Sequence, residues 1–257
     1  MSDSALNYEK IAHLYDSYLQ YTGDLDFFLQ ECQAIAGSVL ELMCGTGRIS
    51  LPLLQAGVNL TCVDASEAML AILRQKLASQ GLKATVVEMD VTQLPWENAF
   101  DAVLLPFQSF HELQSEAAQV QLLQTVARSL RPGGLFICTL HNPVVRRQNL
   151  QQGRQHYGTF ARQDAPGFVD LAVELDAIAP DGTVQGWQLL TELDEAKNAI
   201  AHYRLPLQFR LIEPLLFETL LAGANFSLEA RFGNYDYSPF VPENSPYLIT
   251  RSRLQSN

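Results

Sequence analysis

Residues 39–48, VLELMCGTGR, constrain the fold of this chain more than any other stretch, because they join a short apolar run to a glycine turn and then to a helical pattern. This order predicts a strand, a tight turn and a helix. Gly45 and Gly47 let the backbone turn sharply and let a ligand approach the main chain, while the following helix presents unpaired N–H groups. Glu41, inside the strand, is costly to bury unless it is hydrogen-bonded or near a cation. We therefore expect a site for a small molecule with positive charge.

Strands and helices alternate along the chain as far as residue 140. The apolar runs predict strands at 39–43, 59–63, 84–89, 100–105 and 135–140. Helical periodicity and capping residues predict helices at 7–20, 24–36, 48–55, 66–80 and 115–130. Such βαβ repeats form a parallel sheet with helices on both faces.

The pattern changes after residue 142. Apolar and polar residues alternate in three stretches, at 169–177, 187–193 and 203–209, and Asp181-Gly182 is a hairpin signal between the first two. A helix from Pro214 to Gly223 and strands at 226–232 and 247–253 close the chain. The predicted fold is α/β and Rossmann-like, doubly wound, with a mostly parallel seven-stranded sheet and an inserted antiparallel sheet of three or four strands. Residues 1–142 and 211–257 would form the core, and 143–210 a substrate, lid or dimer subdomain.

The composition limits what the chain can bind. It has 17 Lys and Arg against 28 Asp and Glu, a net charge of -11 that opposes binding to a nucleic-acid backbone. No segment approaches the roughly 20 apolar residues that span a bilayer, and no secretory signal is visible. The four cysteines form no C-x-x-C pair, which predicts buried thiols instead of a metal site or disulfides. We expect a cytoplasmic protein that binds no metal, nucleic acid or membrane.

Three carboxylates, Glu41, Asp64 and Asp90, fall at or near the carboxyl ends of the first three expected strands. In an open α/β sheet these ends form the edge where ligands bind. Asp64 is placed to accept hydrogen bonds from two ribose hydroxyls, and Asp90 from an exocyclic amine. The three carboxylates therefore predict a nucleoside with a cationic tail, and S-adenosylmethionine fits that description.

Five motifs together resemble those of class I S-adenosylmethionine-dependent methyltransferases of the bacterial small-molecule type, over nearly the whole chain. They are the glycine motif at 39–48, TCVDAS at 61–66 with Met69, EMDV at 88–91, FD at 100–101 with LPF at 105–107, and LRPGG at 130–134. Met43 stands where the family usually has its first glycine. The nicotinamide fingerprint G-x-G-x-x-G is not matched, because Ser50 occupies its third position.

The resemblance implies S-adenosyl-L-methionine as the cofactor and assigns residues to its parts. Those expected to contact it are Glu41, Gly45 and Gly47 at the methionine part, Asp64 with Ala65 at the ribose, Met69 at the adenine face, Asp90 and Val91 at the adenine edge, Phe107 at the methyl-bearing end, and Tyr15 in the helix that packs over the site.

Methyl transfer is an in-line displacement that a protein accelerates mainly by placing the acceptor and excluding water. A hydroxyl or ammonium acceptor must also lose a proton, and His111, which follows the fourth strand, is the best candidate for the base. A histidine that packs or caps the next helix explains the same residue equally well.

Residues outside the shared core are expected to select the substrate. The candidates are His141 after the fifth strand, Tyr203 and Arg204 on the inserted strands, and Tyr235 and Tyr237 in the loop near residue 235, although packing also accounts for such aromatic residues. The sequence thus favours methyl transfer to a small-molecule O or N acceptor, in a monomer or a homodimer. The alternative is a methyltransferase-like scaffold that binds the cofactor or a partner without catalysis.

Overall fold

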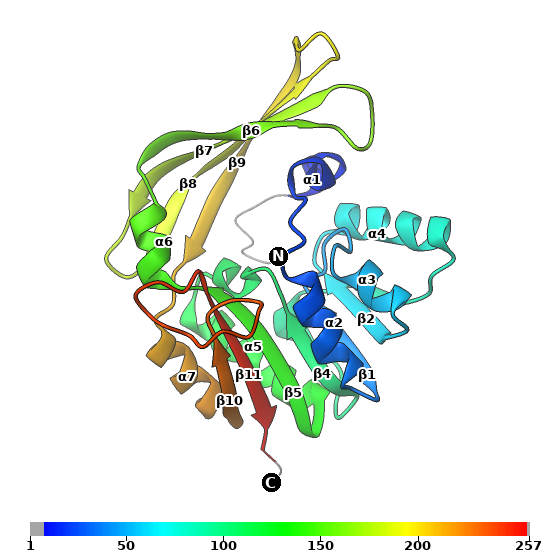
Figure 1. The fold of residues 1–257 in the computed structure, drawn as a ribbon, viewed down its shortest axis with the longest axis vertical. Helices are drawn as coiled ribbons and strands as arrows, with labels where there is room; N and C mark the ends of the chain where they lie inside the picture. The colour runs from blue at the N-terminus through cyan, green and yellow to red at the C-terminus, as the bar shows by residue number, and fades with distance from the viewer. Residues whose placement is uncertain (1–7, 256–257) are drawn as a thin grey trace.

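The computed structural model describes residues 8–255, whose strands form two separate sheets (Figure 1). The strands of the main sheet are β1 (Ser38–Leu42), β2 (Asn59–Asp64), β3 (Thr85–Glu88), β4 (Phe100–Leu105), β5 (Leu130–His141), β10 (Phe226–Phe232) and β11 (Tyr247–Leu254). The smaller sheet consists of β6 (Gly153–Ala161), β7 (Phe168–Ile178), β8 (Thr183–Leu193) and β9 (Ala199–Arg210).

The main sheet has the strand order β10-β11-β5-β4-β1-β2-β3. Its strands β1 to β5 pair in parallel, whereas β11 is antiparallel to both β5 and β10. The smaller sheet is antiparallel throughout, in the order β6-β7-β8-β9. The mostly parallel seven-stranded sheet with an inserted antiparallel sheet is confirmed.

Helices cover both faces of the main sheet. The helices are α1 (Ala12–Tyr18), α2 (Leu25–Gln33), α3 (Ser50–Gln55), α4 (Glu67–Gln80), α5 (Glu116–Ser129), α6 (Pro143–Asn149) and α7 (Pro214–Gly223), with short 3-10 turns η1 (Tyr8–Lys10), η2 (Val91–Gln93) and η3 (Ser109–Glu112). Successive residues of β1 enter opposite hydrophobic clusters because strand side chains alternate. Val39 packs with α2, α3 and α4, and Leu40 packs with α5 and α7.

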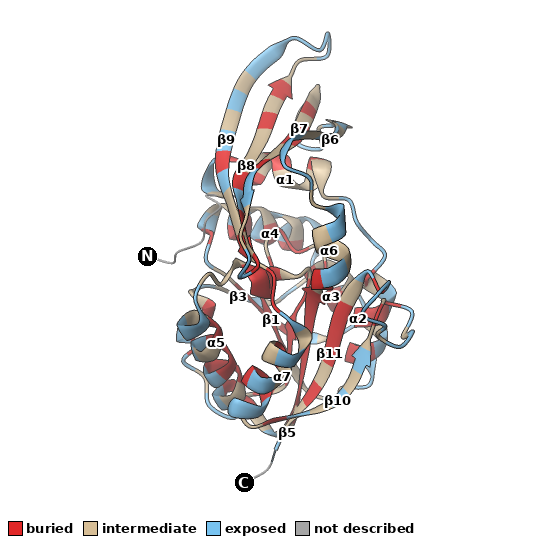
Figure 2. Ribbon diagram, turned by 90° about the vertical axis from the view of Figure 1, so that its left-hand side faces the viewer, coloured by how far each residue is buried: buried red, intermediate tan, exposed pale blue. Residues whose placement is uncertain are grey.

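The smaller sheet extends beyond the carboxyl ends of the parallel strands, and α1 lies beneath it (Figure 1). Ile11 and Leu14 form a hydrophobic cluster with Val169, Leu190 and Leu205 of the sheet. Figure 2 shows buried residues concentrated in the main sheet, whereas the far end of β9 is largely exposed. The insertion therefore stands over the ligand-binding edge and is attached there by α1.

Several elements differ from their predicted limits. The helix expected at 7–20 is η1 followed by α1, because the backbone of Ile11 leaves the helical conformation, with φ -125° and ψ 5°; residue 7 lies outside the described part of the chain. Strand β5 begins at Leu130, before the predicted start at residue 135. It includes Pro132 and the two glycines after it as an irregularity in its pairing with β4. Neither α6 nor β6 was located from the sequence.

Candidate active site

A cavity of about 1160 Å³ separates the carboxyl ends of the parallel strands from the smaller sheet. Pockets for one small ligand are typically about 300–1,000 Å³, so this one has room for a nucleoside and a second molecule. Most of the predicted site residues line it: Tyr15, Gly45, Asp64, Ala65, Met69, Asp90, Val91, Phe107, His111 and His141. Glu41, Gly47, Tyr203, Arg204, Tyr235 and Tyr237 do not.

The two glycines of the turn have different roles. Gly45 adopts φ +55°, and a Cβ there would meet no other atom within 4 Å. Gly47 adopts φ +88°, and a Cβ there would collide with the Leu73 side chain of α4. Gly45 therefore faces the cavity, whereas packing against α4 requires Gly47. Met43, in place of the family's glycine, also has a positive φ of 52°.

Two of the predicted carboxylates reach the cavity from strand ends. Asp64 accepts hydrogen bonds from the N–H groups of Gly45 (2.8 Å) and Ser66 (2.9 Å), while burial raises the pKa of its carboxyl. Asp90 accepts bonds from the backbone N–H (2.9 Å) and hydroxyl (2.8 Å) of Thr92. Both go to Oδ1, so Oδ2 of Asp90 remains available to a ligand.

Glu41 serves the fold instead of contacting the cavity. Its side chain is buried, with 1% exposure of the residue, and the Ser50 hydroxyl donates a 2.6 Å hydrogen bond to Oε2. Burial raises the pKa of Glu41 to about 8, so the carboxyl is mainly protonated at neutral pH. In this structure Glu41 bonds β1 to the start of α3, and its approach to a cationic ligand stays a prediction.

His111 is buried with both ring nitrogens occupied. Nδ1–H donates to the carbonyl oxygen of Arg210 (2.6 Å), and Nε2 accepts from the backbone N–H of His141 (2.9 Å), which together define the neutral tautomer. Burial lowers the pKa of His111 to about 4. Neither nitrogen is free to take a proton from an acceptor, so the expected base role is corrected to a structural one.

His141 lies on the cavity wall, stacked on His111 with ring centroids 5.4 Å apart and an interplanar angle of 14°. Burial, followed by the neighbouring His111 and Arg146, lowers the pKa of His141 well below its usual value. His141 is therefore a neutral polar group at the end of β5, where a substrate could contact it.

Three charged residues of the cavity wall, Glu9, Glu112 and Arg146, were missed from the sequence. Glu112 follows His111, and burial, together with the charge of Asp64, raises its pKa to about 7. Arg146 belongs to α6 and also lines the cavity. The Asn142-Pro143 step was a usable signal for α6, because Asn caps a helix and Pro favours its first turn.

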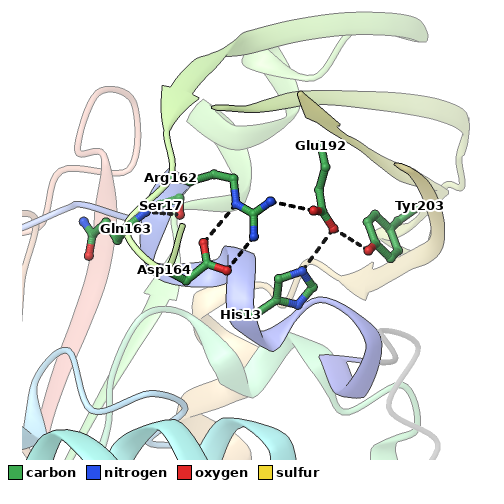
Figure 3. A network of polar contacts seen from close by, with 7 residues as sticks. All are labelled: His13, Ser17, Arg162, Gln163, Asp164, Glu192 and Tyr203. Atoms are coloured by element: carbon green, nitrogen blue, oxygen red, sulfur yellow. Dashed lines mark hydrogen bonds and ion pairs between the residues drawn. The ribbon is translucent and has the colours of Figure 1, made fainter. Parts of the chain in front are cut away.

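Tyr203 and Arg204 lie on β9 away from the cavity. Tyr203 donates its hydroxyl to Glu192, which also accepts from His13 (3.1 Å) and Arg162 (2.6 Å), as Figure 3 shows. Arg204 lies over the Trp187 ring, 3.8 Å from its centroid. The Glu192 network therefore joins α1 to the smaller sheet.

Tyr235 and Tyr237 lie outside the lining of the cavity. Tyr235 is buried among aromatic rings and accepts a 3.1 Å hydrogen bond from Gln108, which itself lines the cavity. The centroid of the Tyr237 ring lies 4.8 Å from the centroid of the Phe27 ring. Tyr235 therefore supports the wall from outside through Gln108, whereas Tyr237 packs against Phe27 and Phe232.

Three further predictions from the sequence concern the cysteines, metal binding and membrane spanning. All four cysteines are buried and free, as predicted. Among residues 8–255, no group of three or more His, Cys, Asp or Glu is arranged to hold a metal ion. In the same part of the chain, no helix is long and apolar enough to cross a membrane.

Several known proteins are similar to this chain in sequence or in fold. Residues 39–134 match the family described as methyltransferase domain. A cypemycin N-terminal methyltransferase from Streptomyces sp. is 33% identical over 148 residues, covering 56% of this chain and 60% of that relative. A demethylmenaquinone methyltransferase from Clavibacter sepedonicus is 32% identical over 140 residues, covering 53% of each protein. The chain therefore aligns with somewhat more than half the length of these relatives.

Two solved structures resemble the whole fold. An S-adenosylmethionine-dependent methyltransferase from Clostridium acetobutylicum has a TM-score of 0.81 at 21% identity, covering 97% of this chain and 99% of its own. The CcbJ methyltransferase from Streptomyces caelestis has a TM-score of 0.76 at 23% identity, with 100% of both chains covered. At sequence identities of 21% and 23%, the structural similarity shows a common fold and nothing further. Together with the match over residues 39–134, it shows that the chain contains a methyltransferase domain and has the overall fold of S-adenosylmethionine-dependent methyltransferases.

Proposed function

We propose that this protein transfers the methyl group of S-adenosylmethionine to a small-molecule O or N acceptor. The observation that carries the proposal is one continuous cavity, which begins at Gly45, Asp64 and Asp90 and reaches Leu171 and Phe209 of the smaller sheet. The first three are the positions that bind the cofactor by resemblance to the family. The remaining space accommodates an acceptor.

The cofactor end offers a matching partner for each part of the nucleoside. Asp64 would accept hydrogen bonds from the ribose hydroxyls, because each carboxylate oxygen has a lone pair beyond those used by the backbone N–H groups. Oδ2 of Asp90 would accept from the exocyclic amine, while Met69 and Val91 would pack against the adenine. Tyr15 and Gly45 would flank the methionine part.

The smaller sheet would form the acceptor wall and keep water out. Leu171 and Val173 of β7, with Leu207 and Phe209 of β9, give that side of the cavity an apolar surface. Bound S-adenosylmethionine supplies an electrophilic methyl group. The protein then contributes mainly by holding the acceptor in line with that methyl and excluding solvent.

Glu112 is the residue that we assign to proton removal from a hydroxyl or ammonium acceptor. It lines the cavity, and no hydrogen bond or ion pair to its carboxylate occurs within residues 8–255. A base works best when its pKa lies near the working pH, and Glu112 meets that condition with a pKa of about 7. A neutral amine needs no proton removed before attack, so the role matters most for the other two acceptor types.

The names of relatives support a small acceptor while leaving its identity open. They include a ubiquinone biosynthesis O-methyltransferase from Caulobacter, matched over 42% of its length, and the sugar N-methyltransferase KedS8. These names describe O and N acceptors in proteins that share parts of this sequence or its fold.

Two measurements, made one after the other, test the proposal. Calorimetric titration with S-adenosylhomocysteine and with NADH should show binding of the first only. Incubation with labelled S-adenosylmethionine and a metabolite panel should then label a small molecule. Cofactor binding without transfer to any member of a broad panel would favour the non-catalytic scaffold, and NADH binding would refute the cofactor assignment.

A further inference from the structure

Arg146 places a positive charge on the cavity wall without a counter-ion. Its Nε is buried and lacks a hydrogen-bond partner, and none of the ion pairs found in residues 8–255 includes its guanidinium. Its neighbour Arg147 shows the contrast, because it is more than a third exposed and forms an ion pair of 2.7 Å with Glu213. Arg146 is half-buried, and no hydrogen bond or ion pair within residues 8–255 occupies its guanidinium. Its charge is therefore available to an anionic group of a ligand that enters the cavity.

The surroundings of Arg146 fit an anion attached to an apolar body. The guanidinium carbon lies 5.7 Å from the centroid of the Phe209 ring. Burial is the main reason why His111 and His141 have lowered pKa values, and the charge of Arg146 adds to it. Both histidines are consequently neutral at pH 7, so Arg146 is the cation among the described residues that line the cavity. Val173 and Leu175 of β7 supply apolar surface in the same cavity.

We propose that Arg146 forms an anion subsite for the methyl acceptor, which therefore carries a carboxylate or phosphate group on an apolar body. This inference rests on the proposed function, because it names the substrate class of the same cavity. The planar guanidinium suits these groups, since it can donate two parallel hydrogen bonds to one oxyanion. Arg146 lies with His141 and Phe209, whereas Gly45 and Tyr15 mark the end assigned to the methionine part. The carboxylate of the cofactor is thus not its partner.

Calorimetry with three small probes tests the subsite directly. Benzoate, phenyl phosphate and the neutral benzamide are titrated into the protein saturated with S-adenosylhomocysteine, and again without it. The variants are R146Q, R146K and the control R147Q, which removes a positive charge from the same helix outside the cavity. We expect at least one anion to bind wild type and R147Q roughly 10- to 100-fold more tightly than benzamide, the range for charge-assisted hydrogen bonds. R146Q should lose this preference and R146K should retain part of it.

Three outcomes overturn the proposal. Benzoate and phenyl phosphate that bind no better than benzamide would show that no anion subsite exists, and an unchanged preference in R146Q would place it elsewhere. R146Q that loses affinity for S-adenosylhomocysteine instead would show that Arg146 serves the cofactor. Comparison of the two anions separates a carboxylate acceptor from a phosphorylated one. Failure of wild type to bind S-adenosylhomocysteine would refute the proposed function alone, because the titrations without it report on the anion separately.

Discussion

The backbone N–H of His141 donates a hydrogen bond to Nε2 of His111, while Nδ1 of the same ring donates to Arg210. One imidazole thus connects η3, the end of β5 and the end of β9. The ends of β5 and β9 are the points where the inserted sheet leaves and rejoins the core. His111 therefore holds the two sheets in register around the cavity.

Replacement of His111 by alanine should destabilise the protein by about 1–3 kcal/mol, because a buried carbonyl and a buried N–H lose their partner. Affinity for S-adenosylhomocysteine should change little. Urea unfolding and calorimetry measure the two effects, with the exposed His202→Gln as control. Unchanged stability, or a loss of turnover that exceeds the loss of folded protein, would contradict the structural role.

The stability advantage of wild type over the alanine variant should also shrink as the pH is lowered from about 6.5 towards 4. In this window the unfolded His111 binds a proton, whereas the folded one, with a pKa of about 4, does not. His111 thus lowers the free energy of unfolding by about 3 kcal/mol across this window, and this loss should be absent from the alanine variant. Unfolding curves at pH 7 and pH 4.5 for both proteins provide the comparison.

Glu112→Gln should lower turnover by roughly 10²–10⁴-fold with a hydroxyl or ammonium acceptor, the usual contribution of a positioned base. The ascending limb of the pH profile near pH 7 should disappear with it. Glu116→Gln, an exposed position at the start of α5, removes the same charge and should leave the rate unchanged. A normal rate and pH profile in the Glu112 variant would mean that positioning alone produces the rate.

Asp64→Asn should weaken binding of S-adenosylmethionine by about 1.5–3 kcal/mol, because charge-assisted hydrogen bonds to the ribose are replaced by weaker neutral ones. The amide oxygen can still accept one of the two backbone bonds, so the turn should persist. Glu67→Gln, which removes a charge from an exposed pair with Arg74, is the matched control. Equal calorimetric affinities of wild type and Asp64→Asn would refute the ribose assignment.

Gly45→Ala should impair cofactor binding by placing a methyl group at the cavity wall, and the positive φ should cost about 1 kcal/mol of stability. Gly57→Ala provides the control, since Gly57 also has a positive φ and open space but lies in a surface turn. Thermal unfolding should therefore shift similarly in both variants. Only the first should lose affinity, and equal affinities would show that the cofactor does not approach Gly45.

The parts of the fold predicted correctly are those with local signals. The apolar run and glycine turn at 39–48 predict β1 and the loop after it, and Asp64 reaches the cavity because the end of a strand determines where it points. In contrast, the polar run of β6 lacks the alternation that marks a half-buried strand, since much of this edge strand is exposed. Its position depends on pairing with β7.

The predicted site residues whose surroundings differ from expectation depend on distant partners. The sequence places His111 near the cavity, but its nitrogens are occupied by Arg210 and His141, which are 99 and 30 residues away. Tyr203 points to Glu192 because β8 and β9 pair in a particular register. The importance of Glu112 likewise follows from burial next to Asp64, which no local pattern reveals.

The position of β11 between β5 and β10 affects how the chain can fold during synthesis. β5 ends at His141 and β11 begins at Tyr247, so the ribosome must add the whole inserted sheet before β5 gains its second neighbour. At about 5–20 residues per second this interval lasts roughly 5–20 s. Throughout it, one edge of β5 has unpaired N–H and C=O groups that another nascent chain could join. Pairing with another chain at this edge therefore competes with completion of the fold until β11 has been added.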